Sequence, residues 1–141
     1  MAKLTMVQAL NLALRQEMET DDSVILLGED IGLDGGVFRV TDGLINQFGE
    51  ERVLDTPLAE SAIAGMSIGM AIYGLKPVCE IQFSGFSYQA FHQIENHAAR
   101  FRCRSQGRFQ VAMVLRAPYG GGVRAIEHHS ESREAYWAHT P

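Results

Sequence analysis

Glu60 is the residue whose surroundings in the sequence best suit unusual acid–base chemistry. It follows the turn Asp55-Thr56-Pro57, and because the residue before a proline is held extended, a helix most naturally begins after Pro57. Glu60 would then lie in the first helical turn. The next residues are almost all small or apolar, so we expect this helix to be buried on most sides. The Glu60 carboxyl is either a structural acid favoured by the helix dipole or a group tuned for proton transfer.

Two further groups, near the C-terminal end of the sequence, also contain residue types that can do chemistry. The adjacent His128 and His129 make a poor metal site, because neighbouring side chains on a loop point apart, so solvated loop histidines are the simpler interpretation. The run Gly120-Gly121-Gly122 could be proposed as a phosphate cradle. It lacks the order of strand, glycine loop, lysine and helix that such a cradle needs, so a flexible loop is the better hypothesis.

Alternating apolar runs and helical patterns would position these residues. A first helix is expected after Thr5, which forms a capping box with Gln8. The apolar runs predict strands buried on both faces, and helical spacing of apolar residues predicts helices between them. The strands are expected at 24–27, 53–54, 78–83 and 111–115, and the longer helices at 58–73 and 87–104. The predicted fold class is therefore α/β, with a mostly parallel sheet sandwiched by helices.

The segments that follow the four strands are where we expect function. Parallel strands end at one edge of a sheet, and ligands bind there, in the loops beyond the carboxyl ends. These segments are 28–30, 55–60, 83–89 and 116–129. Glu60 lies in the second and the histidine pair in the fourth, so we expect the two to approach the same edge.

Composition restricts the classes of function. The 141 residues suffice for one domain with a sizeable core, and a net charge of -5 argues against a broad nucleic-acid surface. Cys79 and Cys103 are too few for a disulfide framework, which fits a reducing cytoplasm. No apolar run is long enough for a membrane span, and the first residues do not have the pattern of a secretory signal.

Five blocks of residues in these loops and strand ends carry a family pattern: Leu27-Gly28-Glu29-Asp30, Asp34-Gly35-Gly36-Val37-Phe38, Asp55-Thr56-Pro57-Leu58-Ala59-Glu60, Glu80-Ile81-Gln82-Phe83 and Arg116-Ala117-Pro118-Tyr119-Gly120-Gly121-Gly122-Val123. In unbroken order from about Thr5 to Pro141, the sequence resembles the β subunit of the decarboxylating component of 2-oxo acid dehydrogenase complexes. Ordered agreement over five blocks is far more specific than one glycine motif.

The resemblance implies a thiamine diphosphate-binding fold of the transketolase-like pyrimidine-domain type. Residues 1–141 would form one pyrimidine-binding domain, incomplete at its C-terminus and without the C-terminal transketolase-like domain, so exposed apolar sheet surface is expected. In this family the β subunit supplies the pyrimidine face of the cofactor site, and the α subunit holds the diphosphate and Mg²⁺. This sequence has no Gly-Asp-Gly run followed by an Asn-rich segment, so no metal ligands are expected in it.

By the same resemblance, Glu60 is the cofactor-activating glutamate. Its carboxyl would hydrogen-bond to the aminopyrimidine ring nitrogen N1′ and promote the imino tautomer, whose exocyclic nitrogen removes the thiazolium C2 proton. The helix N-terminus favours the carboxylate anion, whereas desolvation favours the protonated acid. We predict that desolvation and the bond to the ring dominate.

The resemblance assigns the remaining cofactor contacts to Phe86, which would stack on the pyrimidine ring, and to Leu58, Gln82 and Gln89, which would line the pocket. From the residues alone, Phe86 would be a core aromatic and Gln82 would lie on the wetter face of an alternating strand.

The resemblance also bears on four more positions. His129 would lie at the active-site mouth, near the keto acid and the lipoyl group, where it could donate a proton. Glu29 matches an acid near the subunit interface, or is simply a polar residue that caps a loop. His92 stands where many relatives carry an acid, and His128 is assigned nothing.

The implied function is oxidative decarboxylation of a 2-oxo acid and transfer of the acyl group to lipoamide, by a subunit active only with its α partner. The implied partners are the α subunit, a second β subunit in an α2β2 heterotetramer, and a lipoyl-bearing acyltransferase core, with no nucleic acid or membrane. The alternatives are a non-catalytic truncated relative or interaction protein and, more weakly, a transketolase-like synthase. Pyruvate, branched-chain and acetoin-type substrates are not distinguished.

Overall fold

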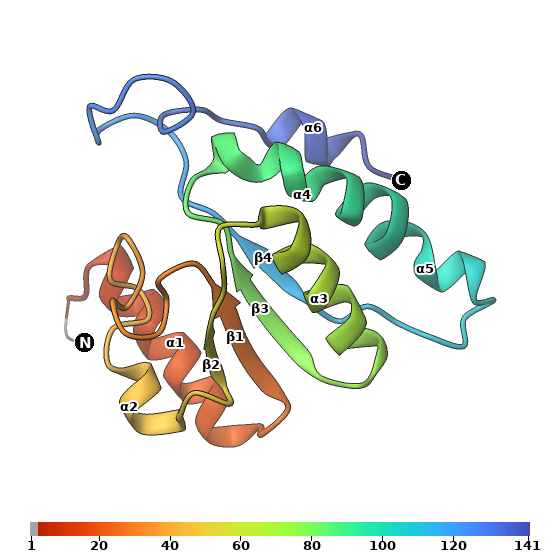
Figure 1. Ribbon diagram of the computed structural model, residues 1–141, viewed down its shortest axis with the longest axis horizontal. Coiled ribbons are helices and arrows are strands. Elements are labelled where there is room, and N and C mark those ends of the chain that lie inside the picture. The colour runs from red at the N-terminus through yellow and green to blue at the C-terminus, as the bar shows by residue number, and fades with distance from the viewer. Residues whose placement is uncertain (1–2) are drawn as a thin grey trace.

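Four parallel strands form a single sheet in the order β2-β1-β3-β4 (Figure 1). The computed structural model describes residues 3–141. The strands are β1 (Val24–Gly28), β2 (Val53–Asp55), β3 (Lys76–Glu80) and β4 (Val114–Arg116). This all-parallel sheet confirms the predicted α/β class.

The four strands end level with one another. In the register of the sheet, Gly28 at the end of β1 pairs with Asp55 and with Glu80, and Glu80 pairs with Arg116. These are the last residues of their strands. The segments after the strands therefore start side by side at one edge, as the sequence predicted.

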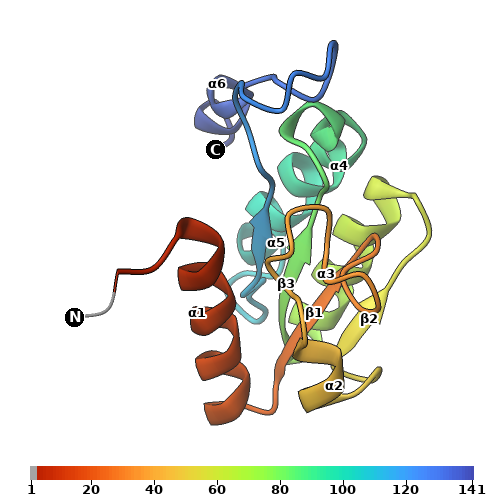
Figure 2. The ribbon, with the colours of Figure 1, turned by 90° about the vertical axis from the view of Figure 1, so that its left-hand side faces the viewer.

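Helices cover both faces of the sheet (Figures 1 and 2). One face carries α1 (Met6–Thr20) and α2 (Leu44–Phe48); the other carries α3 (Glu60–Ile72), α4 (Tyr88–Gln93) and α5 (Ala99–Arg104). For the helices that connect strands, this distribution follows from right-handed crossovers, because the chain moves one way from β1 to β2 and the other way from β2 to β3 and β4.

Two hydrophobic clusters result from the alternation of side chains along the strands. Leu26 packs with Met18 and Leu44 under the first pair of helices, whereas Leu27 packs with Ile63 and Cys79 under α3. All five residues of β1 are buried, which confirms the prediction of a strand covered on both faces.

The first helix begins as its sequence predicts. The Thr5 hydroxyl accepts a hydrogen bond from the Gln8 backbone N–H, and the Gln8 side chain accepts one from the Thr5 N–H, so the capping box is complete.

The helix that starts at Glu60 is buried on one side only. Ile63, Ala64 and Ser67 are buried against the sheet. Met66 and Tyr73 are 45% and 91% exposed, so the prediction of burial on most sides is wrong for the outer face within this chain.

Several predicted boundaries are also wrong. The third strand covers Lys76–Glu80 instead of 78–83, although the Ile81 N–H still donates to the Arg116 carbonyl at 3.0 Å, so the pairing continues past the assigned end. The fourth strand is shorter than predicted, because 111–113 pair with no neighbour in the sheet. The predicted helix over 87–104 is divided by a π-helical turn at Ile94–Ala98 and is preceded by a 3₁₀ turn at Ser84–Ser87.

A short helix near the end of the sequence was not predicted. It is α6 (Glu134–Ala138), and the Trp137 and Tyr136 rings pack edge-on against Phe91 at centroid distances of 5.2 and 6.0 Å. A helix this short has no periodic pattern to read, and its contacts come from a segment far away in sequence.

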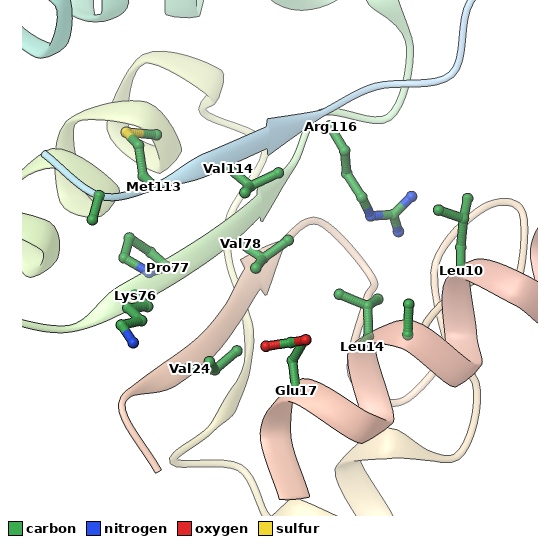
Figure 3. A pocket seen from close by; sticks show the side chains of 12 residues that line it. Leu10, Leu14, Glu17, Val24, Lys76, Pro77, Val78, Met113, Val114 and Arg116 are labelled. Carbon is green, nitrogen blue, oxygen red and sulfur yellow. The ribbon is translucent and has the colours of Figure 1, made fainter. Parts of the chain in front are cut away.

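An apolar groove of about 580 Å³ lies between α1 and the β3–β4 half of the sheet (Figure 3). Leu10 and Leu14 form one wall, and Val78 and Val114 form the floor. The groove exposes apolar side chains of the sheet such as Val114, which is 54% exposed. Among residues 3–141, no helix is both long and apolar enough to cross a membrane.

Candidate functional site

Two buried glutamates lie at the shared edge of the sheet. Glu60 is the first residue of α3 and is 8% exposed; Glu29 directly follows β1 and is 6% exposed. Burial raises the pKa of Glu29 above its ordinary value, and the negative charges of Glu60 and then Asp30 raise it further. The placement of Glu60 in the first helical turn is confirmed, whereas its tuning by desolvation stays a prediction.

One side-chain oxygen of Glu29 also lacks a hydrogen-bonding partner within residues 3–141. Its Oε1 atom is buried, and no group in the described part of the chain bonds to it. Such an orphaned buried acceptor destabilises the fold by about 1–3 kcal/mol unless a ligand or solvent satisfies it. Two acids in one buried place, one of them unsatisfied, make this edge the best candidate for chemistry.

The raised pKa of Glu29 has a predictable effect on stability. Because the folded-state pKa lies above the unfolded value, the folded state binds the proton more tightly, so this contribution to stability is fully present below about pH 4 and is lost as the pH rises through the folded pKa. We expect Glu29→Gln to flatten this part of the pH dependence and to raise the free energy of unfolding at pH 7 by about 1 kcal/mol. Urea unfolding measured from below about pH 4 to pH 7 gives the free energy of unfolding of both proteins. The exposed Glu50→Gln is the control. An unchanged pH profile in Glu29→Gln would contradict the assignment.

A cluster of aromatic rings joins two of the four post-strand segments. The His129 ring lies edge-on to Phe83 and Phe86 at centroid distances of 4.6 and 5.1 Å, and Phe83 and Phe86 are 5.6 Å apart. Phe38, from the loop after β1, adds a fourth ring 5.5 Å from Phe83. The structure therefore brings Phe86 and His129 together.

A glycine makes this approach possible. A Cβ on Gly85 would collide with the backbone carbonyl of His128, so only glycine lets the last segment lie so close. Glu127 and His128 both have a left-handed backbone, with φ of 51° and 47°. The sequence analysis missed this contact, because a contact between residues 85 and 128 leaves no local signal in the sequence.

The other predicted pocket residues differ in placement. Gln82 is half-buried, and its side-chain amide donates to Asp30 at 3.2 Å, which ties the segment after β3 to that after β1. Leu58 is 78% exposed, and Gln89 is also exposed, so this chain does not bury either of them. His92 packs against His97, with ring centroids 5.6 Å apart.

A buried ion pair was missed by the sequence analysis. Glu80 and Arg116, paired across β3 and β4, form a salt bridge with side chains 4% and 19% exposed. Burial raises the pKa of Glu80 and lowers that of Arg116, and the mutual attraction opposes both shifts. The available signal was two charged residues at the ends of adjacent strands.

Among residues 3–141 no three His, Cys, Asp or Glu side chains are arranged to hold a metal ion.

The chain is similar in sequence to known proteins along nearly all of its length. Residues 2–141 match the family described as "Transketolase, pyrimidine binding domain". The chain is 55% identical over its whole length to a pyruvate dehydrogenase E1 component subunit beta of Acholeplasma laidlawii, 43% of which it covers. It is 52% identical over its whole length to a 2-oxoisovalerate dehydrogenase subunit beta of Bacillus subtilis, again covering 43%. Over 97% of its length it is 53% identical to a 3-methyl-2-oxobutanoate dehydrogenase subunit beta of Mycobacterium tuberculosis, covering 39%.

These comparisons bear on the family resemblance seen in the sequence. The similar proteins are β subunits of 2-oxo acid dehydrogenases, as the five sequence blocks indicated, so the resemblance is confirmed. The chain spans less than half of the length of these relatives. The family match, in contrast, covers nearly every residue. The chain therefore belongs to the transketolase pyrimidine-binding domain family.

Proposed function

We propose that this chain is the pyrimidine-binding part of the β subunit of a thiamine diphosphate-dependent 2-oxo acid dehydrogenase. With an α subunit, the enzyme would decarboxylate a 2-oxo acid oxidatively and transfer the acyl group to lipoamide. The observation that carries this proposal is the buried carboxyl of Glu60 at the edge where all four strands end, next to Glu29. The similarity to β subunits of pyruvate and branched-chain 2-oxo acid dehydrogenases supports it.

The residues at this edge fit an aminopyrimidine ring. A buried carboxyl such as Glu60 needs a hydrogen-bonding partner, and Glu29 Oε1 lacks one within residues 3–141. A flat, polar heterocycle supplies hydrogen-bonding nitrogens at its edge and a face on which an aromatic ring can stack. The half-buried ring of Phe86 offers such a stacking surface.

Each proposed site residue would then have a definite task. Glu60 would hydrogen-bond to the ring nitrogen N1′ and exchange a proton there. Phe86 would hold the ring by stacking, and Leu58, Gln82 and Gln89 would line its surroundings. When bound, thiamine diphosphate supplies the nucleophilic carbon and the electron sink for decarboxylation. His129, packed against Phe86, would donate a proton or hydrogen bond near the substrate.

The α subunit would complete the site. It would bind the diphosphate and Mg²⁺, and a second β subunit and the lipoyl-bearing acyltransferase core would complete a cytoplasmic complex. Several large apolar side chains in the loops after β1, β2 and β4 are exposed, which is typical of surfaces that a partner covers. They are Leu33 (84%), Leu58 (78%), Tyr119 (69%) and Ile126 (90%).

Reconstitution tests this function. The chain, mixed with a candidate α subunit, thiamine diphosphate and Mg²⁺, should reduce an artificial electron acceptor when a 2-oxo acid is added. The artificial acceptor makes the acyltransferase core unnecessary in the assay. Each component alone should be inactive. Association with the α subunit without turnover would favour the alternative of a non-catalytic interaction protein. Cofactor binding by this chain without any α subunit would contradict the divided site.

A further inference from the structure

Asp55, the last residue of β2, holds the loop that follows the neighbouring strand β1. Its Oδ1 accepts the Gly32 backbone N–H at 2.6 Å, and its Oδ2 accepts the Leu33 N–H at 3.2 Å. Hydrogen bonds from amides to a carboxylate are about twice as strong as those between neutral groups. We call this arrangement of Asp55 with the two amides the Asp55 clamp.

The clamp joins the two segments that carry the buried acids. Glu29 lies three residues before Gly32, and Glu60 lies five residues after Asp55. The Thr56 N–H also donates to the Gly28 carbonyl at 3.0 Å, so the two segments stay connected on both sides of Glu29.

The clamp explains a glycine. A Cβ on Gly32 would lie 2.6 Å from Asp55 Oδ2, too close for any real contact. Gly32, unlike Gly35 and Gly36, does not have a left-handed backbone. The close approach of the carboxylate, and not the backbone conformation, is therefore what requires glycine here.

We infer that Asp55 is a positioning residue: by holding the loop after β1 against the segment that leads into α3, the Asp55 clamp keeps Glu29 close to Glu60. The role of Glu60 in this inference rests on the proposed function, whereas the geometry of the clamp is independent of that function. Two like charges held together in a buried place cannot both ionise freely, so their separation decides how readily one carboxyl stays protonated. Releasing the clamp lets the segments separate and weakens that coupling.

Two substitutions release the clamp in different ways. Asp55→Asn weakens the bonds and removes a charge, whereas Gly32→Ala pushes the carboxylate off the amides and keeps the charge. An effect that both variants share therefore cannot come only from the lost charge of Asp55. The matched control is Asp34→Asn, which removes an exposed carboxylate from the same loop.

The first readout needs neither cofactor nor partner. Carboxyl-carbon NMR of the unliganded full chain follows the titration of Glu29 and of the two acids that raise its pKa, Glu60 and Asp30. We expect both clamp variants, but not Asp34→Asn, to lower the pKa of Glu29 towards its ordinary value. An unchanged Glu29 titration in a folded Gly32→Ala variant would overturn the inference, whatever the activity of the chain.

The second readout is kinetic. In a reconstituted enzyme, each clamp variant should lower kcat by up to about 100-fold, because a misplaced catalytic group loses orientation, and should leave KM nearly unchanged. The double variant Asp55→Asn/Gly32→Ala should be no worse than Asp55→Asn alone, since both changes break the same contact. Additive losses would overturn the inference. If the unsubstituted reconstituted enzyme is inactive, the proposed function fails while the NMR result still decides the clamp.

Discussion

Glu60→Gln is expected to lower the turnover of the reconstituted enzyme by about 10²- to 10⁴-fold while the fold stays intact. Glutamine keeps the volume and shape of glutamate, so the buried position at the start of α3 stays filled. It can still hydrogen-bond to a ring nitrogen, but it has no ionisable proton to exchange. The loss should therefore appear in kcat. Steady-state kinetics with an artificial electron acceptor measure it.

The control for Glu60→Gln separates chemistry from folding. Glu51→Gln changes an exposed residue and should retain full turnover. The urea midpoints of both variants should stay close to that of the unsubstituted chain. Near-normal turnover of Glu60→Gln would remove Glu60 from its proposed role.

Arg116→Met is expected to destabilise the fold by about 3–5 kcal/mol. The substitution leaves the Glu80 carboxyl, only 4% exposed, without its counter-charge. Burial already raises the pKa of Glu80, and loss of Arg116 removes the attraction that opposes this shift, so the folded-state pKa rises further. Because a raised folded-state pKa stabilises only at low pH, the defect should shrink as the pH falls from 7 through that pKa. Urea unfolding at several pH values measures both effects.

The double variant Glu80→Gln/Arg116→Met provides the matched control. It removes both charges together, so no uncompensated charge stays buried, and most of the lost stability should return. A loss below about 1 kcal/mol in Arg116→Met alone would mean that the pair behaves like a solvent-exposed salt bridge.

The sequence predicted those elements whose signals are local. Thr5 with Gln8, and the turn before Glu60, mark helix starts through short-range rules about caps and prolines. The first helix begins where expected, and the second begins at Glu60 instead of residue 58. The apolar run of β1 identified a buried strand, because Val24 and Leu26 face one core and Leu27 faces the other. Boundaries at 78–83 and 111–115 were missed, because the extent of a strand depends on the neighbour with which it pairs.

The candidate site was predictable in its parts but not in its contacts. Level strand ends follow from a parallel sheet, and they brought the expected segments to one edge. The packing of His129 on Phe86 depends on the close backbone approach at Gly85, a relation between positions over forty residues apart. Under our inference, the closeness of Glu29 to Glu60 likewise depends on the Asp55 clamp, a contact between residues far apart in sequence.

Because the four strands end level with one another, the number of residues in each strand determines how the loops at this edge meet. One residue inserted into β3 would move Gln82 and Phe86 one step out of phase with the loops from β1 and β4, and would turn every later side chain of that strand to the opposite face. Exposed helix positions carry no such constraint. Substitutions on the outer helix surfaces and insertions in loop tips should therefore be tolerated, whereas insertions within a strand should not.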